Sequence, residues 1–178
     1  MNFEDKVNET YQKMLSENKL LPKETLMESY EIFRHNFAPE KLLNLDGEAL
    51  LETMFNHGNK GSLVYWLEFK NDEELQTGRF GGIAGGSALK FGIYKRKEDG
   101  KWITGNPRDM QEIELPEAIE IARKKRDLLA KGAKFIEAVP LDADDFAFKK
   151  MQEYIDEELE GLGNLGWVHK YFHMLFPD

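Results

Sequence analysis

Apolar residues recur every three or four positions over the first third of the chain, which is the pattern of amphipathic helices. The first apolar stripe lies at the start of the chain. A second begins just after Pro22, and proline is tolerated in the first turn of a helix. After a short turn at residues 39–43, Asp46 is the expected N-cap of a third helix. The polar and glycine-containing cluster at residues 56–61 ends this region. We therefore predict a helical segment over residues 1–57.

The middle of the chain, residues 62–104, has the alternation and the aromatic and β-branched residues of strands. We predict an antiparallel β-meander of about four strands here, at residues 62–70, 79–83, 88–95 and 101–104. Asp99-Gly100 supplies the positive φ that a tight hairpin turn requires between the last two strands. Gly105-Asn106-Pro107 is expected to close the sheet.

The last third, residues 115–176, returns to helical spacing. Pro116 opens a long helix in which Gly132 is a candidate kink. Asp144 or Asp145 caps a second helix, and a final short helix, apolar almost all round, either closes the core or docks on something beyond the chain. Helices, a small antiparallel sheet and again helices indicate one α+β domain that spans all 178 residues.

Composition narrows the classes of function. The chain has no cysteine, which excludes disulfides, thiolate metal sites and a cysteine nucleophile and fits a reducing compartment. The acidic N-terminus has no secretory signal, and no apolar run is long enough to cross a bilayer. We therefore expect a cytoplasmic protein without membrane contact. A net charge of −9 disfavours non-specific binding to nucleic acid.

The charge is unevenly spread, because the middle of the chain is basic within an acidic protein. Residues 79–108 contain only two acidic residues beside the basic residues Arg79, Lys90, Lys95, Arg96, Lys97, Lys101 and Arg108. These are either solvated faces or a surface for a polyanion. Exposed aromatic residues beside basic ones stack unpaired bases, and the aromatic candidates of the meander are Tyr65, Trp66, Tyr94 and Trp102. Trp102 joins the basic residues as a nucleic-acid-binding candidate; burial of Trp66 and Trp102 in the core is the alternative.

A glycine-rich stretch at residues 81–87 has three interpretations. A phosphate loop would need a lysine before the serine and a helix after it, and this stretch opens onto a predicted strand. A bulged or tightly turned β-connection is the second interpretation. The third is a loop that a partner approaches along its backbone, formed by Gly81, Gly82, Gly85, Gly86 and Ser87.

Two further patterns have chemical and structural interpretations. Glu68 and Lys70 have the spacing of metal-dependent nucleases on one strand face, but Asp46 is a poor candidate for the second acid; a charged outer sheet face is the alternative. His169 and His173 lie four apart on a helix, a spacing that can hold a metal, although no third ligand is evident. No nucleophile or acid–base pair stands out. We predict no catalytic residue, no metal site, no cofactor and a chain that is not an enzyme by itself.

Three segments carry a family resemblance: residues 63–70 (Leu-Val-Tyr-Trp-Leu-Glu-Phe-Lys), residues 80–94 and residues 164–177. Together they resemble the N-terminal region of bacterial AAA+ ATPases related to McrB, the GTPase subunit of a 5-methylcytosine-specific restriction system. The similarity covers about residues 30–178. In such proteins this region precedes a nucleotide-driven motor and is often the part that reads DNA.

The resemblance implies a targeting module, excised from a longer restriction or phage-defence ATPase, because the chain has no Walker A or Walker B motif. The implied partners are modified DNA, the downstream AAA+ motor domain and a nuclease subunit. One alternative is a protein-interaction or regulatory module that couples the ATPase to a partner subunit. A third possibility is a free-standing enzyme that uses Glu68 and Lys70. Binding of DNA by the basic surface would weaken steeply with salt.

Overall fold

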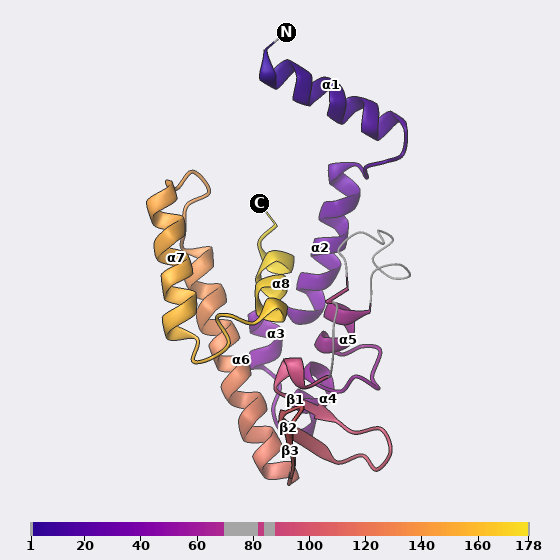
Figure 1. The fold of residues 1–178 in the computed structure, drawn as a ribbon, viewed down its shortest axis with the longest axis vertical. Coiled ribbons are helices and arrows are strands. Elements are labelled where there is room, and N and C mark those ends of the chain that lie inside the picture. Colours follow the sequence, from indigo (N-terminus) through magenta and orange to yellow (C-terminus); the bar gives the residue numbers. More distant parts are fainter. Residues whose placement is uncertain (1, 70–81, 84–87, 178) are drawn as a thin grey trace.

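A computed structural model of the chain describes residues 2–69, 82–83 and 88–177. It has the α+β architecture that the sequence predicts, with helices before and after a small antiparallel sheet (Figure 1). The elements in chain order are α1 (Phe3–Ser16), α2 (Lys23–Phe37), α3 (Pro39–Leu43), α4 (Gly47–Met54), α5 (Leu63–Glu68), the 3-10 helix η1 (Ala88–Phe91), β1 (Ile93–Lys95), β2 (Trp102–Asn106), β3 (Asp109–Ile113), α6 (Leu115–Glu137), α7 (Asp145–Glu158) and α8 (Gly166–Leu175).

The described part of the sheet has three antiparallel strands in the order β1-β2-β3. Tyr94 of β1 lies opposite Ile103 of β2. The first hairpin turns at Gly100, whose φ of +74° confirms the predicted turn. The second turn is held by Asn106, whose side-chain oxygen accepts a hydrogen bond of 2.9 Å from the backbone N–H of Arg108. The expectation that the sheet closes at residues 105–107 is therefore wrong, because this segment turns the chain into β3.

The predicted strand at residues 62–70 is wrong where the structure describes it, because residues 63–68 form the helix α5. Ser62 caps this helix by accepting a hydrogen bond of 3.3 Å from the backbone N–H of Tyr65. The buried residues of α5 are Leu63, Val64, Trp66 and Leu67. That spacing is helical, and burial on one helix face outweighs the strand preference of these residue types.

The other predicted strands have mixed outcomes. Residues 88–91 form the 3-10 helix η1, so only the second half of the strand expected at residues 88–95 exists. The strand expected at residues 101–104 is confirmed as β2. The strand expected at residues 79–83 falls mostly outside the described residues. Asp46 does stand before α4, but its carboxylate makes no capping hydrogen bond.

The hydrophobic core lies where α2, α4, α5, α6 and α8 meet the sheet. The aromatic ring of Phe37 packs 5.3 Å from that of Trp66, edge to face. The hydroxyl of Tyr171 on α8 donates a buried hydrogen bond of 2.9 Å to the backbone carbonyl of Phe37. The terminal helix α8 thus closes the core of this domain, which is one of the two outcomes expected for it.

The long helix α6 continues through Gly132 to Glu137. A Cβ atom on Gly132 would lie 2.5 Å from Cζ of Phe172 on α8 and 3.0 Å from Cδ1 of Leu159. Glycine therefore serves close packing of α6 against α8 and the end of α7. Among the described residues, no helix is both long enough and apolar enough to cross a lipid bilayer.

Candidate functional site

A cavity of about 600 Å³ lies between α5 and the β1–β2 hairpin. Aromatic side chains form part of its wall: Tyr65 of α5, Phe69 just behind α5, and Tyr94 of β1. The rings of Tyr65 and Phe69 lie 5.2 Å apart, and Phe69 is 55% exposed. Arg96 and Lys97, at the start of the hairpin turn, also line the cavity. We call this cavity, with Tyr65, Glu68, Phe69, Tyr94, Arg96 and Lys97, the hairpin pocket.

A cluster of buried polar side chains lies beside the aromatic wall. Oε2 of Glu68 is 3.1 Å from Nε2 of His57, while Oε1 of Glu68 pairs with Nζ of Lys90. The three side chains are only 10%, 15% and 18% exposed for His57, Glu68 and Lys90. Lys90 also donates a hydrogen bond of 3.1 Å to the carbonyl of Ile83. The cluster joins the loop before α5, α5 itself and η1.

The charge of this cluster follows from its burial. Burial is the largest influence on His57 and lowers the pKa of its imidazole, against the opposing effect of the Glu68 carboxylate. His57 is therefore neutral at pH 7, and its ring packs 5.1 Å from that of Phe91. Glu68 takes its compensating positive charge from Lys90. The cluster holds this part of the pocket wall in place. The charges within the cluster nearly cancel.

The predicted basic surface is in large part neutralised by acidic residues on the same sheet. Arg96 pairs with both Asp99 and Glu112, and its contact with Oε2 of Glu112 is 2.6 Å. Lys101 pairs with the same oxygen of Glu112 at 2.8 Å. The hydrogen bond from Arg96 lowers the pKa of Asp99 to about 2. Arg96 and Lys101 are therefore partly neutralised. They would attract a phosphate less strongly than the sequence alone suggests.

Three other predicted binding residues make contacts within the chain, although Lys95 also lines the hairpin pocket. Lys95 pairs with Glu52 of α4 at 2.7 Å, and its Nζ lies 5.8 Å from the ring centre of Trp102. Trp102 is 6% exposed and belongs to the core, so the alternative interpretation of this residue holds and it cannot stack a base. Lys90 is taken up by the cluster with Glu68.

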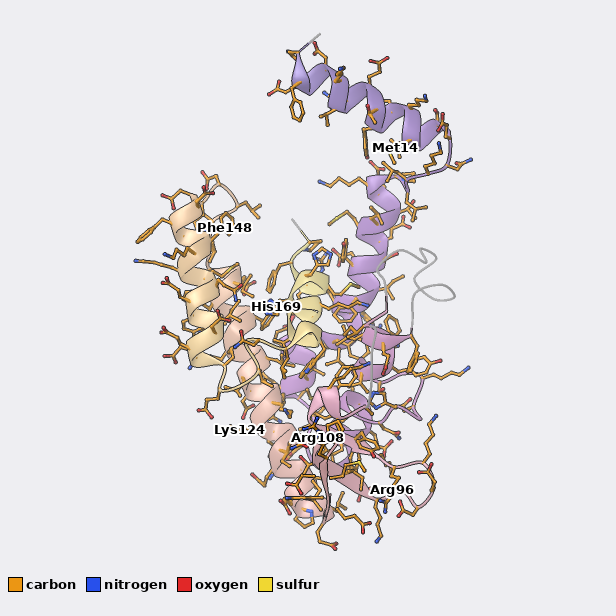
Figure 2. All side chains as sticks on the ribbon, in the orientation of Figure 1. Met14, Arg96, Arg108, Lys124, Phe148 and His169 are labelled. Carbon is orange, nitrogen blue, oxygen red and sulfur yellow. The ribbon has the colours of Figure 1, made fainter. Side chains whose placement is uncertain are left out.

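Lys97 and Arg108 are the exposed basic residues that remain. Within residues 2–69, 82–83 and 88–177, neither makes an ion pair. Lys97 lines the hairpin pocket, whereas Arg108 lies in the β2–β3 turn at the opposite end of the sheet. Figure 2 marks Arg96 and Arg108 on these separate turns. The predicted binding residues thus do not form one continuous surface, and Arg79 lies outside the described residues.

The other candidates from the sequence are the glycine-rich stretch and the pair of Glu68 and Lys70. Gly81, Gly85, Gly86 and Ser87 lie outside the described residues, and Gly82 is exposed and in neither helix nor strand. The strand face expected to hold Glu68 and Lys70 does not exist, because Glu68 lies on α5; Lys70 itself is not described.

The paired histidines of α8 also make no metal site in the described structure. Nε2 of His173 is 3.0 Å from the hydroxyl of Tyr30. Within the described ranges, no three His, Asp or Glu side chains are grouped closely enough to hold a metal ion.

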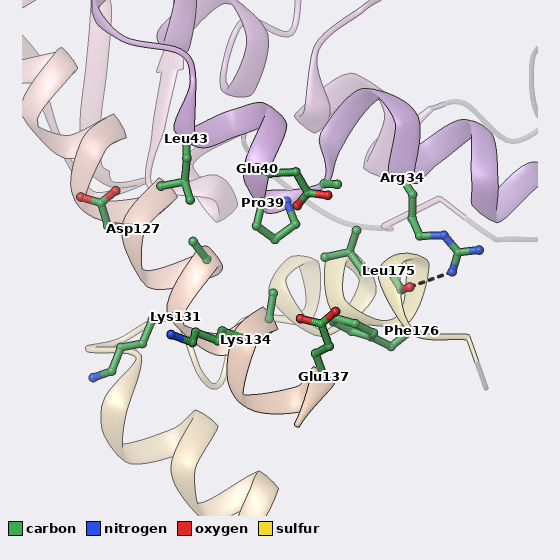
Figure 3. A pocket seen from close by; sticks show the side chains of 13 residues that line it. Arg34, Pro39, Glu40, Leu43, Asp127, Lys131, Lys134, Glu137, Leu175 and Phe176 are labelled. Carbon is green, nitrogen blue, oxygen red and sulfur yellow. Dashed lines mark hydrogen bonds between the residues drawn. The ribbon is translucent and has the colours of Figure 1, made fainter. Parts of the chain in front are cut away.

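A second cavity, of about 680 Å³, lies between α3, α6 and α8 (Figure 3). Its floor is built from small and aliphatic residues such as Ala38, Ala133 and Leu175. Its rim has equal numbers of acidic and basic side chains, contributed by Arg34, Glu40, Asp127, Lys131, Lys134 and Glu137. It has neither the aromatic wall nor the buried polar cluster of the hairpin pocket, which we therefore regard as the candidate site.

Sequence reasoning missed His57 and Phe69 as members of this site. The exposed aromatic residue directly behind α5 is a signal only once residues 63–68 are known to be helical. Comparisons of the chain with models of known protein families, with curated proteins and with solved structures found no match. The similarity to McrB-related ATPases thus stays a prediction.

Proposed function

We propose that this chain is a recognition module that binds DNA in the hairpin pocket, with one unpaired or flipped-out base against the aromatic wall. The observation that carries the proposal is the combination of Tyr65, Phe69 and Tyr94 with Lys97 at one cavity. Every base has a face that stacks on aromatic rings, and a nearby ammonium group suits the adjoining phosphate. Glu68 in the same wall adds a hydrogen-bond acceptor for the edge of the base.

In such a site, base stacking contributes more to the binding free energy than charge does. The chain has a net charge of −9, and four of the predicted basic residues already pair with carboxylates. One or two phosphate contacts give a slope of only about −1 for log affinity against log salt. Base stacking contributes about 1–3 kcal/mol per base. We therefore propose weak binding with a shallow salt dependence, in place of the steep one expected from the sequence.

In biological terms, the proposal is a targeting module of an McrB-like AAA+ restriction or phage-defence ATPase. Its support is the family resemblance of the three sequence segments. In that setting the ligand is modified DNA, and the motor domain and a nuclease subunit act downstream. The alternative, a module that couples the ATPase to a partner subunit, requires no DNA binding.

Fluorescence anisotropy with short labelled single strands, at low salt, tests the proposal. Tyr94→Ala should weaken binding by about 5- to 100-fold, because it removes a stacking surface. Arg108→Ala is the matched control, since Arg108 lies at the other end of the sheet; it should change the affinity less than twofold. Absence of binding to single-stranded, duplex or methylated DNA contradicts the proposal and favours the partner-coupling alternative. Equal losses in both variants contradict the pocket as the site.

A further inference from the structure

The aromatic wall of the hairpin pocket has a carboxylate beside it. Tyr65 and Glu68 lie three residues apart on α5, so they share one side of that helix, and both line the cavity. The ring of Phe69, the next residue, lies 5.2 Å from that of Tyr65. A base that stacks on these rings therefore has the side chain of Glu68 at its edge.

Two neighbours hold this carboxylate in position. Its Oε1 pairs with Nζ of Lys90, and its Oε2 is 3.1 Å from Nε2 of His57. These contacts and the burial of the side chain restrict its rotamer before any ligand binds. The two oxygens of a carboxylate have about four lone-pair sites between them. Each oxygen of Glu68 therefore has room for one further hydrogen bond.

The four bases differ in what their Watson–Crick edges offer to such a carboxylate, which accepts hydrogen bonds and cannot donate them. Guanine has two adjacent donors, N1–H and the N2 amino group, which match two carboxylate oxygens. Adenine and cytosine each have one amino group beside a ring nitrogen that is itself an acceptor. Thymine has one N–H between two carbonyl oxygens. In these three bases an acceptor would face one oxygen of Glu68, so guanine is the best match.

We propose that the hairpin pocket selects guanine, whose N1–H and N2–H groups donate to the two carboxylate oxygens of Glu68 while its ring lies against the aromatic wall. This inference rests on the proposed function, because it requires a base in the pocket. A purine also has more ring surface for stacking than a pyrimidine has. The cavity of about 600 Å³ is within the size range of pockets that hold small ligands. Glu68 is then the residue that determines specificity, whereas the rings bind any base.

The described lining of the pocket contains a second carboxylate, that of Glu98. Glu98 lies in the β1–β2 turn and is exposed, whereas the side chain of Glu68 is only 15% exposed. An exposed side chain loses conformational freedom when it binds a ligand, and a side chain that is already held in place loses less. We therefore assign base recognition to Glu68, and Glu98 serves as the matched control.

Competition binding to the natural chain, with short thymidine strands that differ in one central base, tests the preference. Guanine at that position should bind roughly 5- to 150-fold more tightly than thymine, as expected for a bidentate contact. Inosine has the purine ring of guanosine without the N2 amino group, so it should lose most of this advantage. Equal affinity for guanine and inosine, or tighter binding of adenine or cytosine, overturns the inference.

Two variants assign the contact, with circular dichroism to show that each is folded. In Glu68→Gln the amide can accept from N1–H and donate to O6, which guanosine and inosine share, so the two strands should bind equally. Glu98→Gln should keep the preference for guanine, and loss of the preference in Glu98→Gln alone overturns the assignment to Glu68. Binding without base preference that Tyr94→Ala still weakens contradicts this inference alone. Absence of binding to every strand contradicts the proposed function as well.

Discussion

Glu68 on α5 and Lys90 on η1 form a mostly buried ion pair beside the hairpin pocket, and His57 contacts the second oxygen of the same carboxylate. The pair joins two elements that lie 22 residues apart in sequence. Removal of either charge breaks this ion pair in a poorly hydrated place, where water replaces the lost contact poorly. The cluster therefore links the stability of the domain to the shape of its candidate site.

Glu68→Gln should lower the free energy of unfolding by about 1–3 kcal/mol, because the change breaks the ion pair with Lys90 and the contact with His57 in a mostly buried place. Lys97→Ala, an exposed change in the same pocket, should cost less than about 0.5 kcal/mol. Urea unfolding measures both. In the double variant Glu68→Gln with Lys90→Met, we expect a smaller loss than the sum of the single changes. Additive losses would show that the two side chains do not interact.

The pH dependence of stability should carry the signature of His57. Burial lowers its pKa in the folded state below the ordinary value of 6.5, so the unfolded chain binds more protons between these two values. Stability is therefore complete above pH 6.5 and falls as the pH drops through this window. His57→Gln should flatten the change between pH 7 and 5 in urea unfolding. An unchanged slope in that variant would assign the effect to other groups.

Asp46 and Arg123 form a two-pronged ion pair between the start of α4 and α6, with contacts of 2.6 and 2.8 Å. The hydrogen bond from Arg123 lowers the pKa of Asp46 to about 2. We predict that Arg123→Gln brings the pKa of Asp46 back toward its ordinary value of 3.8. A carboxyl titration followed by NMR measures it. A pKa that stays near 2 in Arg123→Gln would contradict the contact.

Gly132→Ala should destabilise the domain by about 1–3 kcal/mol, because its Cβ would overlap the ring of Phe172. Alanine is otherwise the better helix former by about 1 kcal/mol, so destabilisation would reveal the overlap. Gly166→Ala is the control, since nothing lies within 4 Å of the Cβ position there. Thermal unfolding compares the two. A stabilised Gly132→Ala would contradict the close packing of α6 and α8.

The sequence was sufficient for the features that depend on local pattern. The α+β class, the long helix α6 and the Gly100 hairpin follow from periodicity and turn chemistry. Residues 63–68 were misread because their aromatic and branched side chains prefer strands, whereas their burial pattern is helical. A helix is favoured by the spacing of these residues, and also by Ser62, which is a good N-cap.

The candidate site was harder to predict, because its charges are balanced by residues distant in sequence. Lys95 and Arg96 pair with Glu52 and Glu112. A count of basic residues within one segment therefore overstated the positive charge of the predicted surface. No local pattern connects His57 with Glu68. Trp102 is a residue type that can stack on bases, but its side chain lies in the core. Only the fold, which places α5 and the β1–β2 hairpin around one cavity, brings the aromatic wall together.

A nuclear magnetic resonance titration of the labelled chain with a short single strand tests the central claim most directly. The account predicts chemical-shift changes at Tyr65, Phe69, Tyr94 and Lys97 that saturate together, with the resonances around Arg108 unchanged. Changes centred on Arg108, or a spectrum that does not respond to any strand at low salt, would contradict it.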